Sequence, residues 1–119
     1  EGEAVGGRVH GVRWDARALP LRPDSVDVIV VDMPFGRRVG SKEDNVTLYP
    51  ACIREMRRIL RRDTGRAVIL TTERRKVEQT VQKTAQAWRG VSKRAVFFGG
   101  VRGTLFCLTR SNEAFDPEV

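Results

Sequence analysis

The 119-residue sequence has few of the residues that build metal sites or disulfide frameworks. It contains two cysteines, Cys52 and Cys107, and one histidine, His10. Because the cysteines lie far apart, each within an apolar segment, we expect two buried, reduced thiols and no metal site. His10 stands between short valine-containing stretches, and we expect it to be a strand residue without a catalytic role.

Long apolar runs are also missing. No run approaches the roughly 18 residues that a membrane-spanning helix needs, and the opening EGEAVGG is acidic and glycine-rich, unlike a signal peptide. We therefore expect a soluble, cytoplasmic protein that does not bind a membrane. Hydrophobic residues make up 40% of the sequence and charged residues 31%, a composition typical of one folded domain.

Acidic residues are fewer than basic ones. Lysine and arginine number 22 against 15 aspartates and glutamates, which gives a formal net charge of +7. Such a surface attracts polyanions, and nucleic acid is the most common polyanion inside a cell. Net charge alone does not show that the protein binds nucleic acid, because arginines that only solvate helix faces explain the positive charge equally well.

Apolar runs predict strands at residues 26–32, 66–71, 94–98 and 104–109. A further strand-like run, GRVHGVRWDA, precedes them, with Val9 and Val12 as its apolar members. The runs VIVV and AVIL are continuously apolar, which is typical of parallel strands covered on both faces. The glycines of GGVRG predict a tight hairpin turn between the last two strands.

Two helices are predicted between these strands. In the first, apolar side chains recur at helical spacing from 48 to 60, while the arginines fall mainly on the other side. We expect Thr47 to cap this helix, Pro50 to lie in its first turn and Gly65 to end it. The second runs from 77 to 88 and ends at Trp88. The element order β, β, α, β, α, β, β predicts an α/β fold with a mostly parallel sheet and a closing C-terminal antiparallel hairpin.

Two of the predicted strands end in a carboxylate, at Asp15 and Asp32. In open α/β sheets the ligand crevice lies beyond the carboxyl ends of the strands. We therefore expect both side chains to point into one crevice. Capping of the following turn explains Asp15 equally well.

The residues that follow Asp32 suit the binding of an amine on an aromatic base. Such a nitrogen is a poor nucleophile, so an enzyme must orient it and accept its hydrogens as the new bond forms. The Asp32 side chain and the Pro34 carbonyl provide two acceptors, Phe35 provides a ring for stacking, and Gly36 permits close approach of the backbone. An ordinary strand-to-loop turn would use the same residues.

The segment DMPFG resembles the Asp/Asn-Pro-Pro-Tyr/Phe motif of S-adenosylmethionine-dependent amino-methyltransferases. The longer stretch DMPFGRRVGSKEDNVTLYPACIREMRRIL, together with TGRAVILT and FFGGVRG, is similar to the tRNA (guanine-N2-)-methyltransferases that carry a THUMP domain. The resemblance runs from about Trp14 to Phe115. It implies part of a Rossmann-like methyltransferase fold, S-adenosyl-L-methionine as cofactor, and methylation of the exocyclic N2 amine of guanine in tRNA.

The resemblance also implies residue roles. Asp32, Pro34 and Phe35 would hold the target guanine as catalytic residues, and Asp15 with the Ala16 backbone would meet the adenine of the cofactor. Further substrate-binding residues are expected within the motif and along the loop after it, at Met33, Gly36, Arg37, Arg38 and Lys42. The cations of this loop are expected to steer RNA phosphates, although solvated loop charge explains them too. Gly99, Gly100 and Arg102 are candidates to line the RNA side, although a hairpin turn explains them almost as well.

A complete enzyme of this family has a glycine-rich cofactor turn and a THUMP domain, and neither is visible here. We therefore expect residues 1–119 to be the C-terminal part of a methyltransferase catalytic domain, inactive and poor at binding the cofactor alone. The family also implies a small zinc-containing activator subunit as partner. Two other functions remain open: transfer to an adenine amine or a protein glutamine, and a noncatalytic basic module that binds RNA or another protein.

Overall fold

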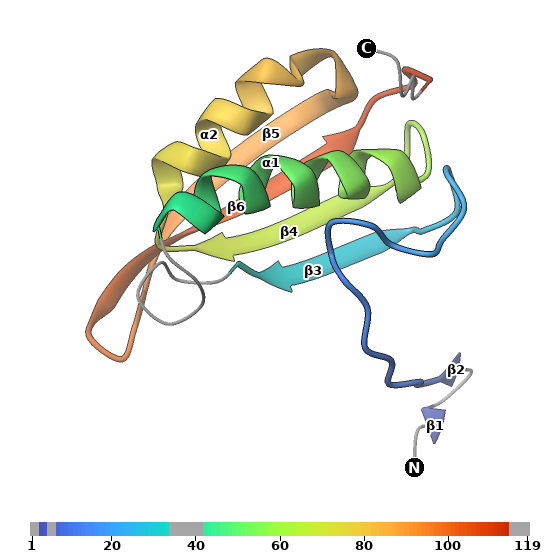
Figure 1. The fold of residues 1–119 in the computed structure, drawn as a ribbon, viewed down its shortest axis with the longest axis horizontal. Coiled ribbons are helices and arrows are strands. Elements are labelled where there is room, and N and C mark those ends of the chain that lie inside the picture. Colours follow the sequence, from blue (N-terminus) through green and yellow to red (C-terminus); the bar gives the residue numbers. More distant parts are fainter. Residues whose placement is uncertain (1–2, 5–6, 34–41, 115–119) are drawn as a thin grey trace.

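The computed structural model describes residues 3–4, 7–33 and 42–114, and Figure 1 shows their arrangement. In chain order the elements are β1 (Glu3–Ala4), β2 (Gly7–Arg8), β3 (Val28–Asp32), α1 (Lys42–Ile59), β4 (Arg66–Thr71), α2 (Arg74–Lys83), the 3-10 turn η1 (Ala85–Ala87), β5 (Trp88–Phe98) and β6 (Val101–Arg110). The expected α/β class is confirmed. None of the described helices is long and apolar enough to cross a membrane.

Four strands form the main sheet, in the order β3-β4-β6-β5. β3 and β4 are parallel, with Asp32 opposite Leu70, whereas β6 runs antiparallel to both β4 and β5. The described sheet is therefore mixed, and the prediction of a mostly parallel sheet is wrong because β6 runs antiparallel to both of its neighbours. The antiparallel C-terminal hairpin is confirmed. The hairpin turn is tight because Gly99 and Gly100 both take positive φ angles, 54° and 76°, which glycine adopts without a steric penalty.

The prediction of a strand in GRVHGVRWDA is wrong. β2 is only two residues long and pairs with β1, and the chain that follows is irregular up to Asp15. Val9 and Val12 are 69% and 62% exposed. A strand forms where a neighbour satisfies its backbone N–H and C=O groups, and within the described residues no strand pairs with the segment 9–15.

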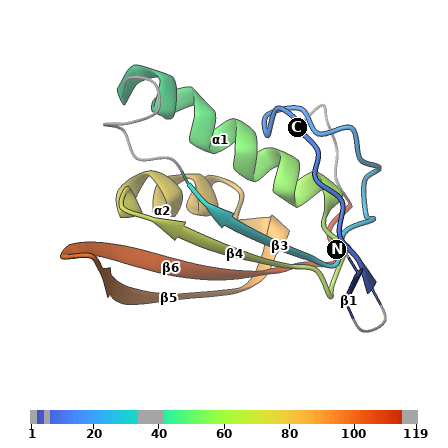
Figure 2. The same cartoon turned by 90° about the horizontal axis from the view of Figure 1, so that it is seen from below.

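Both helices lie on the same face of the sheet (Figure 2). Ile29 and Val31 of β3 pack toward this covered face, whereas Val28 and Val30 on the other face are 57% and 77% exposed. Coverage on both faces was expected, and for the described residues that expectation is wrong. The reason is the chain path: the connection between β3 and β4 and the one between β4 and β5 both place their helix on one side.

The core lies between α1, α2 and the covered face of the sheet. It contains apolar side chains from both helices and all the long strands, namely Met33, Tyr49, Cys52, Ile53, Met56, Leu60, Ala67, Ile69, Val77, Val81, Ala87, Trp88, Phe106 and Leu108. Cys52 is buried as expected, but Cys107 is exposed. The prediction for Cys107 is wrong because β6 alternates: its neighbours Phe106 and Leu108 face the helices, so Cys107 faces away.

Helix α1 is longer than the apolar pattern predicted. It begins at Lys42, so Pro50 lies inside the helix and not in its first turn, where its missing N–H removes one backbone hydrogen bond. The helix ends at Ile59, because the chain before β3 binds its last carbonyls. The N–H groups of Asp24 and Val26 donate to the carbonyl oxygens of Arg58 at 3.0 Å and Ile59 at 2.9 Å, groups that have no partner within the helix.

The second helix is shorter than predicted. α2 ends at Lys83, and Trp88 is the first residue of β5, not the last of the helix. Thr84 explains the early end: its hydroxyl and its N–H both donate to the Thr80 carbonyl, at 2.9 and 3.1 Å. This bonding tightens the chain into η1. The indole N–H of Trp88 then donates to the Thr84 hydroxyl at 3.0 Å.

A substitution at Gly65 tests the packing behind the end of α1. A Cβ atom at this position would lie 2.6 Å from the Arg61 carbonyl oxygen and 2.8 Å from the Arg61 nitrogen, and both are backbone atoms that cannot turn away. We expect Gly65→Ala to lower the free energy of unfolding by about 1–3 kcal/mol, the usual cost of overpacking, measured by urea denaturation.

Gly90→Ala is the matched control. There the added carbon meets only Thr109, at 3.5 Å, which is ordinary van der Waals contact, so we expect little change in stability. Equal unfolding free energies for Gly65→Ala and the unaltered protein would contradict the tight turn between α1 and β4.

Candidate active site

Asp32 is the last residue of β3 and lies at the carboxyl end of the parallel pair. The next residue, Met33, is only 1% exposed, and its N–H donates to the Leu70 carbonyl at 2.8 Å. Met33 thus fixes the chain immediately after Asp32, while strand alternation leaves the carboxylate of Asp32 exposed. Because the Met33 side chain belongs to the core, only its backbone is available to a substrate.

Several predicted site residues follow this point. Lys42 is the first residue of α1, and its side chain lies outside the described part of the structure. The other predicted residues of this loop also lie outside the described residues: Pro34, Phe35, Gly36, Arg37 and Arg38. Their roles stay predictions.

Next to Asp32, the carboxyl end of β4 carries a buried polar pair that the sequence reasoning missed. The hydroxyl oxygens of Tyr49 and Thr71 lie 3.3 Å apart, both residues are fully buried, and Thr71 accepts a 2.8 Å hydrogen bond from the Glu73 N–H. Burial raises the pKa of Tyr49, and the negative charges of Glu73 and Asp32 raise it further. The phenol is therefore neutral at physiological pH, and its hydroxyl joins α1 to the carboxyl end of β4.

Asp15 lies in an exposed turn and not at the end of a strand. Its carboxylate accepts hydrogen bonds from the Arg17 backbone N–H at 2.9 Å and from the Arg17 guanidinium at 2.9 and 3.0 Å. These bonds lower the pKa of Asp15 to about 2. The expectation that Asp15 ends a strand is wrong, because residues 9–15 form no strand. That its carboxylate and that of Asp32 point into one crevice stays a prediction. Ala16 is exposed in the same turn.

An ion pair on α1 holds the chain after this turn. Glu55 accepts a 2.7 Å hydrogen bond from the Leu19 N–H, and Arg58 donates to the carbonyl oxygens of Leu19 and Leu21, both at 2.8 Å. The two side chains also bond to each other at 2.8 and 2.9 Å. We call Glu55 and Arg58 the α1 clamp. The arginine pattern had predicted a solvent-facing Arg58, although the acid three residues before it was a readable signal.

The α1 clamp places the Asp15 turn near the middle of the helix. Burial raises the pKa of Cys52 to about 11, and the charge of Asp15 is the next largest cause, so this turn and Cys52 lie within electrostatic range. At neutral pH the Cys52 thiol is protonated, which rules it out as a thiolate nucleophile.

Comparison with known families decides the class of the domain. The model for RMKL-like methyltransferase domains (UPF0020) matches residues 2–104. The chain belongs to this family. Membership confirms the methyltransferase resemblance inferred from DMPFG and its surroundings, and it places the Asp32 end of the sheet within a methyltransferase domain.

Individual relatives agree with this assignment. The tRNA (guanine(6)-N(2))-methyltransferase THUMP3 of Mus musculus is 46% identical over 107 residues, which cover 90% of this chain and 21% of the mouse protein. The protein of the same name from Homo sapiens is 45% identical over the same shares. The methyltransferase domain described here therefore spans about a fifth of the length of these relatives.

Two solved structures share the fold. A Thermus thermophilus protein described as a DNA modification methylase superposes with a TM-score of 0.63 at 14% identity, covering 87% of this chain and 53% of its own. A T. thermophilus 16S rRNA N2 methyltransferase in complex with AdoMet and guanosine gives 0.51 at 18% identity, covering 81% and 23%. At such identities the likeness establishes the fold alone.

The α1 clamp gives a pH-dependent stability prediction. Hydrogen bonds from Arg58 hold the pKa of Glu55 below its ordinary value of 4.5, so its contribution is complete above that value and is lost as pH falls through the folded pKa. We expect Glu55→Gln to cost about 3 kcal/mol at pH 7, because it removes one partner of a largely buried pair. The cost should shrink below pH 4.5 in urea titrations.

Asp27→Asn is the matched control, since Asp27 pairs with Arg61 at 2.7 Å but its side chain is 79% exposed, against 8% for Glu55. An exposed pair contributes at most about 1 kcal/mol. Equal costs for the two variants at pH 7 would show that the α1 clamp does not hold the 19–21 segment.

Proposed function

We propose that this chain is the part of an S-adenosyl-L-methionine-dependent enzyme that methylates the N2 amine of guanine in tRNA. The observation that carries the proposal is Asp32, an exposed carboxylate at the end of a parallel strand, which begins the motif DMPFG in a member of a methyltransferase family. The 46% identity to a tRNA guanine-N2 methyltransferase supports this acceptor over adenine or glutamine.

In the proposed mechanism, the chain orients the amine and performs no covalent catalysis. The Asp32 carboxylate accepts one hydrogen of the guanine N2 amine, the Pro34 carbonyl accepts the other, and Phe35 stacks on the base. Acceptors fixed in advance stabilise the positive charge that develops on the nitrogen as its new bond forms. Met33, anchored in the core and to Leu70, supports this placement because it limits the movement of the backbone beside Asp32.

S-adenosyl-L-methionine would supply a methyl group already activated on a positively charged sulfur. The Asp15 turn fits its adenine end, since Asp15 offers a charged acceptor for the amino group and Ala16 offers backbone groups beside it. The Arg17 guanidinium now occupies that carboxylate, so we infer that it moves aside when adenine binds. We further propose that residues 1–119 are the C-terminal part of the catalytic domain and that the glycine-rich cofactor turn lies elsewhere in the protein.

As the resemblance implies, the proposed partners are tRNA and a small zinc-containing activator subunit, and the proposed location is the cytoplasm. The share of the THUMP3 relatives that this chain covers supports testing activity in the complete protein. The alternative of a noncatalytic RNA-binding module makes a different prediction for Asp32.

Asp32→Ala in the complete protein tests the mechanism. We expect kcat/KM for transfer of a labelled methyl group to tRNA to fall at least about 100-fold, because one preorganised acceptor is lost. Binding of tRNA, measured by fluorescence anisotropy, should stay within about twofold. Asp32→Asn keeps one acceptor oxygen and should retain more activity than Asp32→Ala.

Asp27→Ala is the control for this experiment, because it removes an exposed carboxylate from the opposite end of the same strand region, where Asp27 pairs with Arg61. Its methyl transfer should match that of the unaltered protein. Full activity of Asp32→Ala would refute the catalytic role and favour the noncatalytic module.

A further inference from the structure

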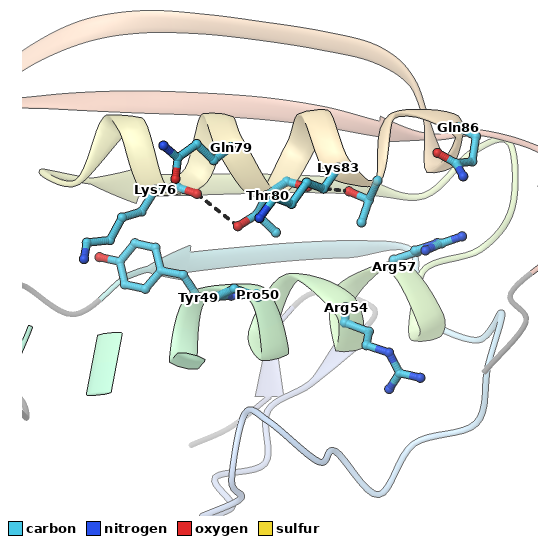
Figure 3. Close-up of a pocket in the computed structure, with 10 residues that line it drawn as sticks. Tyr49, Pro50, Arg54, Arg57, Lys76, Gln79, Thr80, Lys83 and Gln86 are labelled. Carbon is cyan, nitrogen blue, oxygen red and sulfur yellow. Dashed lines mark hydrogen bonds between the residues drawn. The ribbon is translucent and has the colours of Figure 1, made fainter. Parts of the chain in front are cut away.

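A cavity of about 430 Å³ lies between α1 and α2 on the side of the helices away from the sheet, as Figure 3 shows. We call it the helix groove. Four of its lining side chains are cations: Arg54 and Arg57 on α1, and Lys76 and Lys83 on α2. Among the described residues that line it there is no carboxylate. The helix groove therefore has the charge of an anion-binding site.

One end of the helix groove adjoins the candidate active site. Tyr49 lines this end, and its hydroxyl lies 3.3 Å from Thr71 at the carboxyl end of β4. Tyr49 is also close enough to Asp32 for that charge to raise its pKa, after the larger effect of burial. From there the groove follows the helices to Gln86 (Figure 3). A strand that enters the active site can thus continue along the groove.

Several polar groups of the groove are already hydrogen-bonded within the protein. The Thr80 and Thr84 hydroxyls donate to carbonyl oxygens of α2 itself, at 3.0 and 2.9 Å, so they are committed to their own helix. Arg57 is fixed at the far end by two hydrogen bonds from its Nη2 to Glu113, at 2.6 and 2.8 Å. Lys76 and Lys83 are the cations that α2 contributes to the groove, and no carboxylate is among the described residues that line it.

The placement of charge on α2 is unfavourable for the helix itself. Its first turn contains Arg74, Arg75 and Lys76 and no acidic residue, while Glu73 at the N-cap and Glu78, within electrostatic range of Arg74 and Arg75, offset part of this charge. The amino end of a helix dipole is itself positive and favours negative side chains. The first helical turn therefore combines the dipole with three cations, next to the active-site end of the groove. A bound anion relieves this repulsion.

The spacing of the lysines indicates an extended ligand. Lys76 and Lys83 are seven residues apart on α2, which corresponds to about 10 Å at 1.5 Å per residue. Successive backbone phosphates of an extended strand can contact the two lysines one after the other along the groove. We propose that the helix groove binds backbone phosphates of the RNA strand that flanks the target nucleotide. This inference rests on the proposed function for its choice of RNA.

The test is removal of the two lysines in the complete protein, as Lys76→Gln/Lys83→Gln, with fluorescein-labelled tRNA as the probe. We expect the Kd for tRNA to rise at least tenfold at 0.1 M salt. The slope of log K against log salt should become shallower by about 1.4, since each single-strand phosphate contact contributes about 0.7. At saturating tRNA, kcat should remain unchanged, because the lysines do not touch the reacting amine.

Two further variants make the result specific. Lys76→Arg/Lys83→Arg keeps the charge and should bind tRNA within threefold of the unaltered protein. Arg62→Ala/Arg66→Ala removes the same charge where the chain leaves α1 and enters β4, at the end of the sheet opposite Asp32, and should also bind within threefold. Circular dichroism at 222 nm should show the same helix content for all variants.

Each outcome of these binding measurements supports or overturns the proposal that the helix groove binds RNA phosphates. An unchanged Kd and salt slope for the glutamine variant would overturn it, even if the protein methylates tRNA as proposed. Weaker binding only in the glutamine variant would support it, even if no methyl transfer were detected. If the unaltered protein does not bind tRNA, or if the arginine-to-alanine control loses as much affinity as the lysine variant, the proposal fails.

Discussion

The parallel pairing of β3 with β4 is the constraint on which the rest of the structure depends. Two parallel strands that follow each other in the chain need a crossover connection, and α1 occupies it. The pairing sets Asp32 opposite Leu70 and brings Thr71 to the same end. At the other end, the chain before β3 binds the last carbonyls of α1. One strand pair therefore fixes the position of the helix, the direction of the carboxyl ends and the place of the motif.

Helix α1 organises what lies around this pair. Its inner side fills the core, and Tyr49 joins it to the carboxyl end of β4. The α1 clamp holds the chain after the Asp15 turn, so side chains perform the positioning that a paired strand was expected to provide. A further side of the helix lines the helix groove. The Asp15 turn, the carboxyl end of β4 and the helix groove are thus all positioned relative to α1.

The positive charge of the chain divides into two groups. Some arginines are structural: Arg110 is 1% exposed, and its guanidinium donates to the carbonyl oxygens of Arg57 at 2.9 Å and Glu113 at 2.7 Å, while burial lowers its pKa. Arg58 belongs to the α1 clamp. The net charge of +7 therefore says less about anion binding than the location of the cations, such as Lys76 and Lys83 in the helix groove.

The sequence by itself determined the α/β class, the strands of the main sheet, the hairpin turn and the methyltransferase family, because periodicity, glycine placement and the DMPFG segment are local signals. Only the tertiary structure decided that residues 9–15 form no strand, that Trp88 begins β5, and that Glu55 and Arg58 hold a segment more than thirty residues away. Local pattern reports which side chains are apolar and how they repeat. It does not report which distant backbone groups become available as partners, and those partners determine whether a strand forms, where a helix ends and whether an arginine faces water.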